Sequence, residues 1–139
     1  MQDPHFDELS IGDELPALKL PPISRTTLAL YAGASGDHNP IHIDLDFARQ
    51  AGMPDVFAHG MLSAAYLGRL LTGWVRQEQI REIRLRFTDI THLQDAPVCT
   101  GRIIERFEHD GEKRARLELK STVRSGTDAI VGEAVVALS

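Results

Sequence analysis

Residues 60–75 read GMLSAAYLGRLLTGWV, and this stretch decides the fold class. Its apolar side chains cover almost every direction around a helical wheel, and a helix of this kind is expected to be buried. The stretch is too short for a membrane span and includes Ser63, Arg69 and Thr72. We therefore expect a buried central helix and no membrane span.

The period of the apolar residues changes from 3.6 to 2 after this helix. Apolar and charged side chains alternate along residues 83–88 and 114–124, as expected for half-buried antiparallel strands. Residues 98–107 and 129–138 suggest two more strands, and Asp110-Gly111 is a strong hairpin signal. We expect these four strands to form a meander that curls around the helix, which gives an α+β fold.

The first half of the chain contains signals for two shorter helices. Ser24 is a plausible N-cap for a helix that ends at Gly36. Asp44 has the same role before residues 45–51, and residues 15–20 have a weak strand-like pattern. All these elements fit a single domain over residues 1–139.

Composition and charge exclude several classes of protein. A net charge of −5 and a pI near 5.6 argue against nucleic acid as a partner. Cys99 is the only cysteine, so no intramolecular disulfide is expected. The N-terminal residues do not have the pattern of a secretory signal, and we expect a cytoplasmic protein.

Residues 36–42, GDHNPIH, contain a candidate acid/base pair, Asp37 and His42. At this spacing the two side chains would diverge on a helix and would point to opposite faces on a strand. Proline fixes φ and restricts the residue before it, so Asn39-Pro40 can turn the chain. Asp37 and His42 can therefore converge only across a turn.

Two other interpretations of this segment remain open. The same residue types occur in ordinary loops that end helices. A metal site is also conceivable, but the spacings match no zinc pattern and cysteine ligands are absent. The possible ligands would be Asp37, His38, His42, Asp44 and His59. We expect no metal and no cofactor.

Two runs of sequence resemble the MaoC-like dehydratase family, which includes (R)-specific enoyl-CoA hydratases. Residues 31–52 read YAGASGDHNPIHIDLDFARQAG, and residues 57–62 read FAHGML. They match the family pattern Gly-Asp-x-Asn-Pro-x-His, followed by His-Gly-Met at a central helix. The resemblance covers essentially the whole chain. It implies a hot-dog fold, in which a curved antiparallel sheet wraps around a central helix, and assembly as a homodimer.

The resemblance also implies an activity, the reversible hydration of trans-2-enoyl thioesters of coenzyme A or acyl carrier protein. Asp37 and His42 would then be the catalytic pair, and Asn39 would help to hold the loop and meet the substrate. We favour His42 as the base, because the unperturbed pKa of histidine lies near neutrality, and Asp37 as the acid. The reverse assignment remains open.

Gly60 and His59 lie at the start of the central helix. The free N–H groups of a helix N-terminus can stabilise an enolate oxygen, so we assign this role to Gly60. The alternative is that Gly60 only packs against the sheet. His59 is expected near the substrate as a supporting or helix-capping residue.

Two further features bear on substrate recognition. Arg84 and Arg86 share one strand face and are candidates for binding the phosphates of the substrate, although charged strand faces are often simply solvated. The hydratase branch of the family would have a serine five residues after Gly60. This chain has Ala65 there, and Ser63 points elsewhere on the helix, so the branch stays open.

Two rival functions remain within this fold. A thioesterase would need a carboxylate on the central helix, but residues 60–75 contain no Asp or Glu. A non-catalytic acyl-thioester subunit that depends on an active partner is the second rival. The presence of both Asp37 and His42 argues against it.

Overall fold

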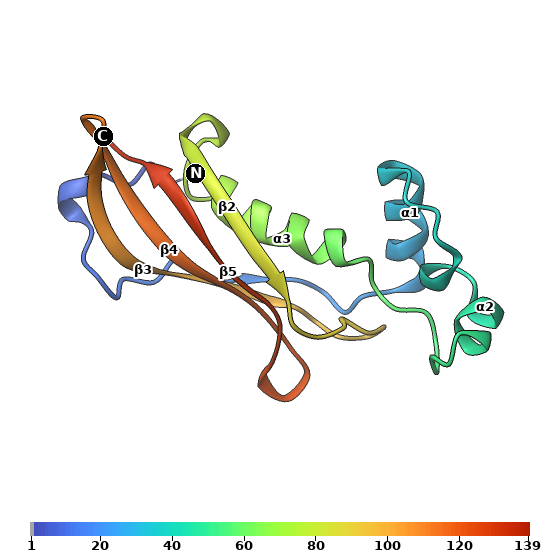
Figure 1. Ribbon diagram of the computed structural model, residues 1–139. Helices are drawn as coiled ribbons and strands as arrows, with labels where there is room; N and C mark the ends of the chain where they lie inside the picture. Colours follow the sequence, from blue (N-terminus) through green and yellow to red (C-terminus); the bar gives the residue numbers. More distant parts are fainter. Residues whose placement is uncertain (1) are drawn as a thin grey trace.

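A single helix, α3 (Gly60–Thr72), lies against the concave face of one curved antiparallel sheet (Figure 1). The computed structural model describes residues 2–139. The strands are β1 (Leu18–Lys19), β2 (Ile80–Phe87), β3 (Val98–His109), β4 (Glu112–Val123) and β5 (Thr127–Ala137). The expected wrapping of a sheet around a central helix is confirmed. Within the described residues, no helix is long and apolar enough to cross a membrane.

The order of the strands differs from the predicted four-stranded meander. The observed order is β1-β3-β4-β5-β2, so only β3, β4 and β5 follow one another as a meander. Strand β2 pairs with β5 at the edge of the sheet, where Leu85 lies opposite Gly132. A Cβ atom at Gly132 would collide with the backbone carbonyl of Arg84. Alternation predicts which way a side chain faces but not which strand lies beside it, so the prediction for β2 was wrong.

The main core fills the space between α3 and the sheet. Its fully buried members include Leu67, Leu71, Ile103, Leu117 and Leu119. The helix ends at Thr72, earlier than predicted, but Trp74 and Val75 are still buried in this core.

The sequence predicted a helix that is buried on all sides, but α3 is partly exposed. Met61 is 61% exposed, and Ala65 is also exposed on the side turned away from the sheet. The sheet therefore covers only one side of an almost wholly apolar helix.

The two predicted shorter helices are confirmed as α1 (Arg25–Ser35) and α2 (Leu45–Gln50), which lie together at one end of the molecule (Figure 1). The Ser24 side chain accepts a hydrogen bond from the Thr27 N–H, and Asp44 caps α2 in the same way. A second apolar cluster joins these helices to the start of α3, and it contains Ile23, Leu28, Ala48, Val56, Ala58 and Leu62. Short 3₁₀ turns occur at Phe6–Glu8, Pro40–His42, Gln77–Gln79 and Arg124–Gly126.

Candidate active site

The loop after α1 makes the turn that the sequence predicted. Gly36 ends the helix with a φ of 77°, in the left-handed region that suits glycine. The Asn39 N–H then donates to Oδ1 of Asp37 at 3.2 Å, and the Ile41 N–H donates to Oδ1 of Asn39 at 3.1 Å. These two bonds set the direction of the chain into the 3₁₀ turn Pro40–His42. The predicted loop-holding role of Asn39 therefore has a direct structural basis.

His42 is fixed by the segment that leads into α3. Its Nδ1 lies 2.8 Å from the carbonyl oxygen of Phe57. A carbonyl only accepts hydrogen bonds, so Nδ1 carries a proton and the neutral ring has its lone pair on Nε2. The Phe57 ring also meets the imidazole edge to face, with centroids 5.0 Å apart. His42 is thus oriented with one nitrogen free to accept a proton.

His59 is buried directly beside His42. It is 1% exposed, and its ring stacks on that of His42 with centroids 4.0 Å apart and an interplanar angle of 29°. Its Nε2 donates to the backbone carbonyl of Asp37 at 3.2 Å, while Nδ1 has no partner within residues 2–139. Burial lowers the pKa of His59, and the nearby His42 lowers it further. His59 occupies the N-cap position of α3, but within residues 2–139 its side chain makes no capping bond.

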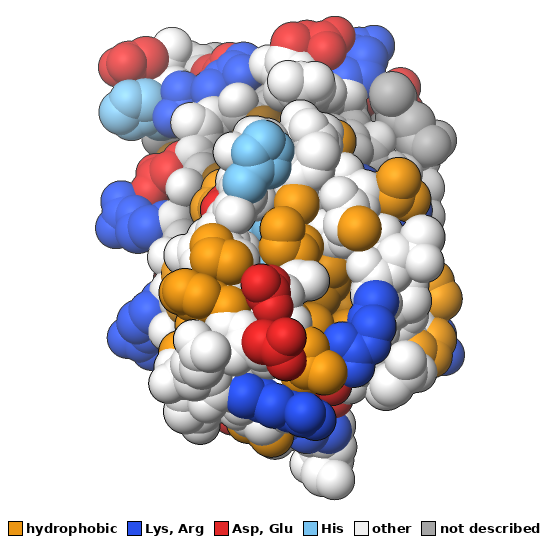
Figure 2. All heavy atoms as spheres, turned by 90° about the vertical axis from the view of Figure 1, so that its right-hand side faces the viewer, with side chains coloured by type: hydrophobic (Ala, Val, Ile, Leu, Met, Phe, Trp, Pro, Cys, Tyr) orange, Lys and Arg blue, Asp and Glu red, His pale blue; other side chains and the backbone are white. Residues whose placement is uncertain are grey.

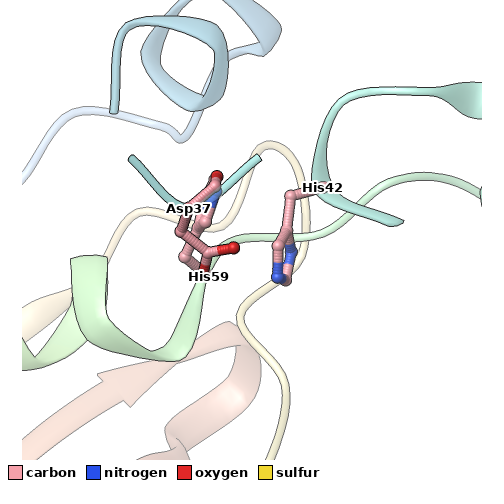
Figure 3. A group of neighbouring side chains, drawn as sticks. All are labelled: Asp37, His42 and His59. Carbon is pink, nitrogen blue, oxygen red and sulfur yellow. The ribbon is translucent and has the colours of Figure 1, made fainter. Parts of the chain in front are cut away.

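The side chains of Asp37, His42 and His59 converge from three segments of the chain (Figure 3). A carboxylate oxygen of Asp37 and one ring nitrogen from each histidine all lie within 4.8 Å of one another. Asp37 is exposed and His42 is half-buried, so a small molecule can reach both. The predicted convergence of Asp37 and His42 is present. The stacking of His59 on His42 is a contact that sequence reasoning missed.

The same three residues are poorly arranged to hold a metal ion. Imidazole lone pairs lie in the plane of the ring, and the two ring planes are stacked at 4.0 Å with an angle of only 29°, so an ion between them could not lie close to both planes. The geometry therefore favours proton transfer over metal binding.

Gly60 begins α3 at the edge of a cavity of about 160 Å³, which Phe57 and Phe87 also line. The first N–H groups of a helix have no acceptor within the helix, so they are available to a ligand. Phe57 is also the residue whose carbonyl holds His42, so the cavity and the acid/base pair share a wall. A Cβ atom at Gly60 would come within 3.1 Å of the Phe87 ring. A glycine at this position leaves the approach to the helix N-terminus open.

Arg84 and Arg86 lie apart from this cluster. They line a separate hollow of about 530 Å³ on the sheet, whose other charged residues are Glu118, Lys120, Asp128 and Glu133. Arg84 is also paired with Glu82. The structure does not bring these arginines to Asp37 and His42, and phosphate binding by them remains a prediction.

Ser63 and Ala65 point to different sides of α3, as their spacing predicted. Ala65 is exposed, whereas Ser63 is 3% exposed and donates a hydrogen bond to the hydroxyl of Thr91 at 3.3 Å. This buried hydroxyl pair is also part of the lining of the cavity beside Gly60. No local sequence signal connects Ser63 with Thr91.

The surface at the α1–α2 end carries apolar side chains among charged ones (Figure 2). Leu30, Ile43 and Phe47 are all exposed, and Ile43 directly follows His42. A ligand that approaches the loop from this end therefore meets apolar as well as charged groups.

Cys99 is not a candidate nucleophile. It is fully buried on β3, and burial raises the pKa of its thiol to about 11. The thiolate is the reactive form of cysteine, so this thiol is inert near neutral pH.

The chain is similar in sequence to proteins of one family. The model of the MaoC-like domain family matches residues 8–128. The fatty acid synthase subunit beta of Saccharomyces cerevisiae is 28% identical over 76% of this chain and 6% of its own length. An (R)-specific enoyl-CoA hydratase of Rhodospirillum rubrum is 34% identical over 48% of this chain and 45% of its own length. The chain thus spans less than half the length of these curated relatives.

Solved structures show the same fold. The unliganded R-hydratase PhaJ1 of Pseudomonas aeruginosa superposes with a TM-score of 0.83 at 26% identity, over 97% of this chain and 86% of that one. The curved five-stranded sheet around α3 is therefore a hot-dog fold.

We predict that His59 contributes to the loss of stability in acid. Because its pKa is lowered in the folded state, the unfolded chain takes up the proton first as the pH falls through about 6.5. The wild-type melting temperature should therefore fall between about pH 7 and 5. His59→Gln keeps an N–H donor for the Asp37 carbonyl but cannot be protonated, so its loss should be smaller. The measurement is thermal unfolding followed by circular dichroism across this pH range.

His38→Gln is the matched control, because His38 is exposed in the same loop. Its pH dependence should equal that of the wild type. A wild-type slope in His59→Gln would show that His59 does not contribute to the acid response.

Proposed function

Because the chain belongs to the MaoC-like domain family, we propose that it is a hydro-lyase that reversibly adds water to trans-2-enoyl thioesters. The observation that carries this proposal is the convergence of Asp37 and His42, with Nε2 of His42 left free by the bond to Phe57. The names of its relatives, which include enoyl-CoA hydratases, support the same reaction. Substrates carried by coenzyme A or acyl carrier protein also suggest a cytoplasmic location.

In the proposed reaction, His42 activates the water molecule. Water is a poor nucleophile at neutral pH, so it must lose a proton as it attacks Cβ of the enoyl thioester. Nε2 of His42 takes this proton while the water oxygen bonds to Cβ. The electron pair of the double bond moves towards the thioester carbonyl and gives an enolate.

Asp37 completes the addition by delivering a proton to Cα. The carboxyl of Asp37 gives its proton to Cα as the enolate collapses to the 3-hydroxyacyl thioester. The proton that His42 took from water then returns to Asp37, so the pair shares one proton over the cycle. Both groups act from the same side, so the addition is syn, and the (R)-3-hydroxyacyl product follows the naming of the relatives.

Gly60 is proposed to stabilise the enolate. Its N–H belongs to the first turn of α3, where the helix dipole favours negative charge. A carbonyl that enters the neighbouring cavity can approach this N–H without meeting a side chain at Gly60. Such a preorganised donor is most effective where charge develops during the reaction.

We also propose that the chain forms a homodimer through the β2 edge. Strand β2 lies at the end of the sheet, and its Ile83 and Phe87 are 44% and 52% exposed. Met61 adds a further exposed apolar side chain from α3. An unpaired apolar sheet edge of this kind is commonly covered by a second copy.

The proposed reaction is tested by hydration of a panel of trans-2-enoyl-CoA substrates, with chiral analysis of the products. Asp37→Asn and His42→Gln should each lower kcat at least about 10²-fold, because each removes one proton-transfer group. Circular dichroism would show whether both variants remain folded. Near wild-type turnover in either variant would remove that residue from the mechanism. The absence of hydration with both coenzyme A and carrier-protein thioesters would overturn the function.

The role of Gly60 is tested by Gly60→Ala, with Gly68→Ala as a control in the same helix. The new methyl group at Gly60 would press on Phe87 and narrow the approach to the helix N-terminus, whereas a Cβ at Gly68 would meet no atom of the described residues within 4 Å. We expect kcat/KM to fall about 10-fold or more in Gly60→Ala and to stay near wild type in Gly68→Ala. Equal rates in the two variants would contradict the oxyanion role.

The dimer is tested by light scattering after gel filtration. A charge at the proposed interface opposes association, so Ile83→Asp should shift the chain towards the monomer. Leu30→Asp places the same charge on α1, at a side chain that is 69% exposed, and should leave the dimer intact. A wild-type chain that elutes as a monomer, or a dimer that is unaffected by Ile83→Asp, would rule out this interface.

A further inference from the structure

The segment between β2 and β3 is held near both of its ends by one guanidinium group. This segment, residues 88–97, extends from the sheet towards α1 and α2 (Figure 1). The guanidinium of Arg124 donates to the Ile90 carbonyl at 2.7 Å. Its nitrogens also lie 3.9 Å from a carboxylate oxygen of Asp89 and 3.6 Å from one of Asp95. Arg124 therefore ties the two ends of the segment to one point.

Arg124 is itself positioned by the tight turn that joins β4 to β5. The ladder between these strands ends with Val123 opposite Thr127. Ser125 and Gly126, which lie between them, have φ angles of 52° and 77° in the left-handed region. The turn directly follows two long paired strands, so Arg124 is attached to the rigid sheet.

Asp95 transmits this constraint to the chain that leads into α3. Its side chain is only 7% exposed, and a carboxylate buried to this extent needs a cation and hydrogen-bond donors. It accepts the His92 N–H at 2.8 Å. His92 forms an antiparallel bridge with Phe57, and the carbonyl of Thr91 accepts the Ala58 N–H at 2.9 Å. The buried carboxylate is thus connected to the backbone just before α3.

We propose that Arg124 is a positioning residue that holds the Phe57 carbonyl, and through it the imidazole of His42, in the orientation needed for proton transfer. This inference rests on the proposed hydratase function and adds a remote residue to it. The Phe57 carbonyl lies 2.8 Å from Nδ1 of His42 and leaves Nε2 free. A small displacement of this carbonyl would turn the base away from its target, and proton transfer is sensitive to such changes.

The buried charge of Asp95 explains how the loss of a distant cation would reach the site. Without Arg124, this carboxylate has no compensating charge and is drawn towards water. Its side chain and its backbone N–H both bond to His92, and its carbonyl accepts the Ile23 N–H at 2.8 Å. Movement of Asp95 therefore displaces His92 and, with it, the bridge to Phe57.

The kinetic test measures kcat and KM with the best trans-2-enoyl-CoA substrate of the panel. Arg124→Met should lower kcat about 10-fold and leave KM near wild type, because Arg124 acts on the geometry of proton transfer and not on binding. Arg124→Lys keeps a cation near Asp95 and should stay within about 3-fold of the wild-type kcat. The control is Arg102→Met, which removes a guanidinium from its pair with Glu118 on the sheet and should match the wild type.

A double variant separates the effect of the buried charge from a general loss of stability. Asp95→Asn keeps an oxygen that can accept the His92 N–H but has no charge that needs Arg124. Added to Arg124→Met, it should bring kcat back to within about 3-fold of the wild type, because no buried charge is then left unpaired. A general structural defect would instead increase with the second substitution. Thermal unfolding of each variant gives the folded fraction to which kcat is referred.

Long-range proton–nitrogen NMR spectra test the same coupling without a substrate, because they distinguish the two tautomers of a neutral histidine. The wild-type His42 should carry its proton on Nδ1, where the Phe57 carbonyl accepts it. In Arg124→Met the tautomer with the proton on Nε2 should appear, and in the double variant it should disappear again.

Wild-type turnover or an unchanged His42 tautomer in Arg124→Met would overturn the inference while the hydratase function stands. The same conclusion follows if the double variant is as slow as Arg124→Met, or if the defect lies in KM alone. A wild type that hydrates no thioester would overturn the proposed function. The NMR comparison would then decide by itself whether Arg124 orients His42.

Discussion

The hydrogen bond between Nδ1 of His42 and the carbonyl of Phe57 joins two segments that are 15 residues apart in the sequence. It draws the loop after α1 onto the segment that enters α3, and it determines which nitrogen of His42 keeps a lone pair. The same Phe57 lines the cavity beside Gly60. The orientation of the base and the wall of the cavity therefore share one residue, Phe57, just before the central helix. The acceptor that holds His42 is a backbone carbonyl, which is less mobile than a side-chain acceptor would be.

Burial of His59 has an energetic cost that the site offsets locally. A buried imidazole nitrogen without a partner is unfavourable, yet among residues 2–139 Nδ1 of His59 has none. The ring gains a hydrogen bond to the Asp37 carbonyl and contacts with the rings of Tyr31 and His42. Because burial keeps His59 uncharged, it adds no repulsion when His42 accepts a proton. A histidine that remains neutral can thus support a base without opposing its protonation.

Local patterns in the sequence predicted most of the fold and the main part of the site. The periods of 3.6 and 2 located the helices and strands, and Asn39-Pro40 predicted the turn that brings Asp37 to His42. The pairing of β2 with β5 was not predictable in this way, because it depends on where the chain goes after Phe87. The same limit applies to Ser63 and Thr91, which are 28 residues apart and meet only when the segment after β2 folds back against α3. Contacts of this kind are set by tertiary packing, on which the local periodicity carries no information.

The exposed side of α3 connects the proposed assembly with the proposed chemistry. An almost wholly apolar helix is stable when both its sides are covered, but the sheet of one chain covers only one side. Phe87 is part of the exposed β2 edge and also part of the cavity rim, where its ring lies close to Gly60. A second copy that covers this edge would therefore also bury Phe87 and limit the access of water to the rim. Exclusion of water strengthens hydrogen bonds to a developing enolate, so dimer formation and catalysis would depend on the same apolar surface.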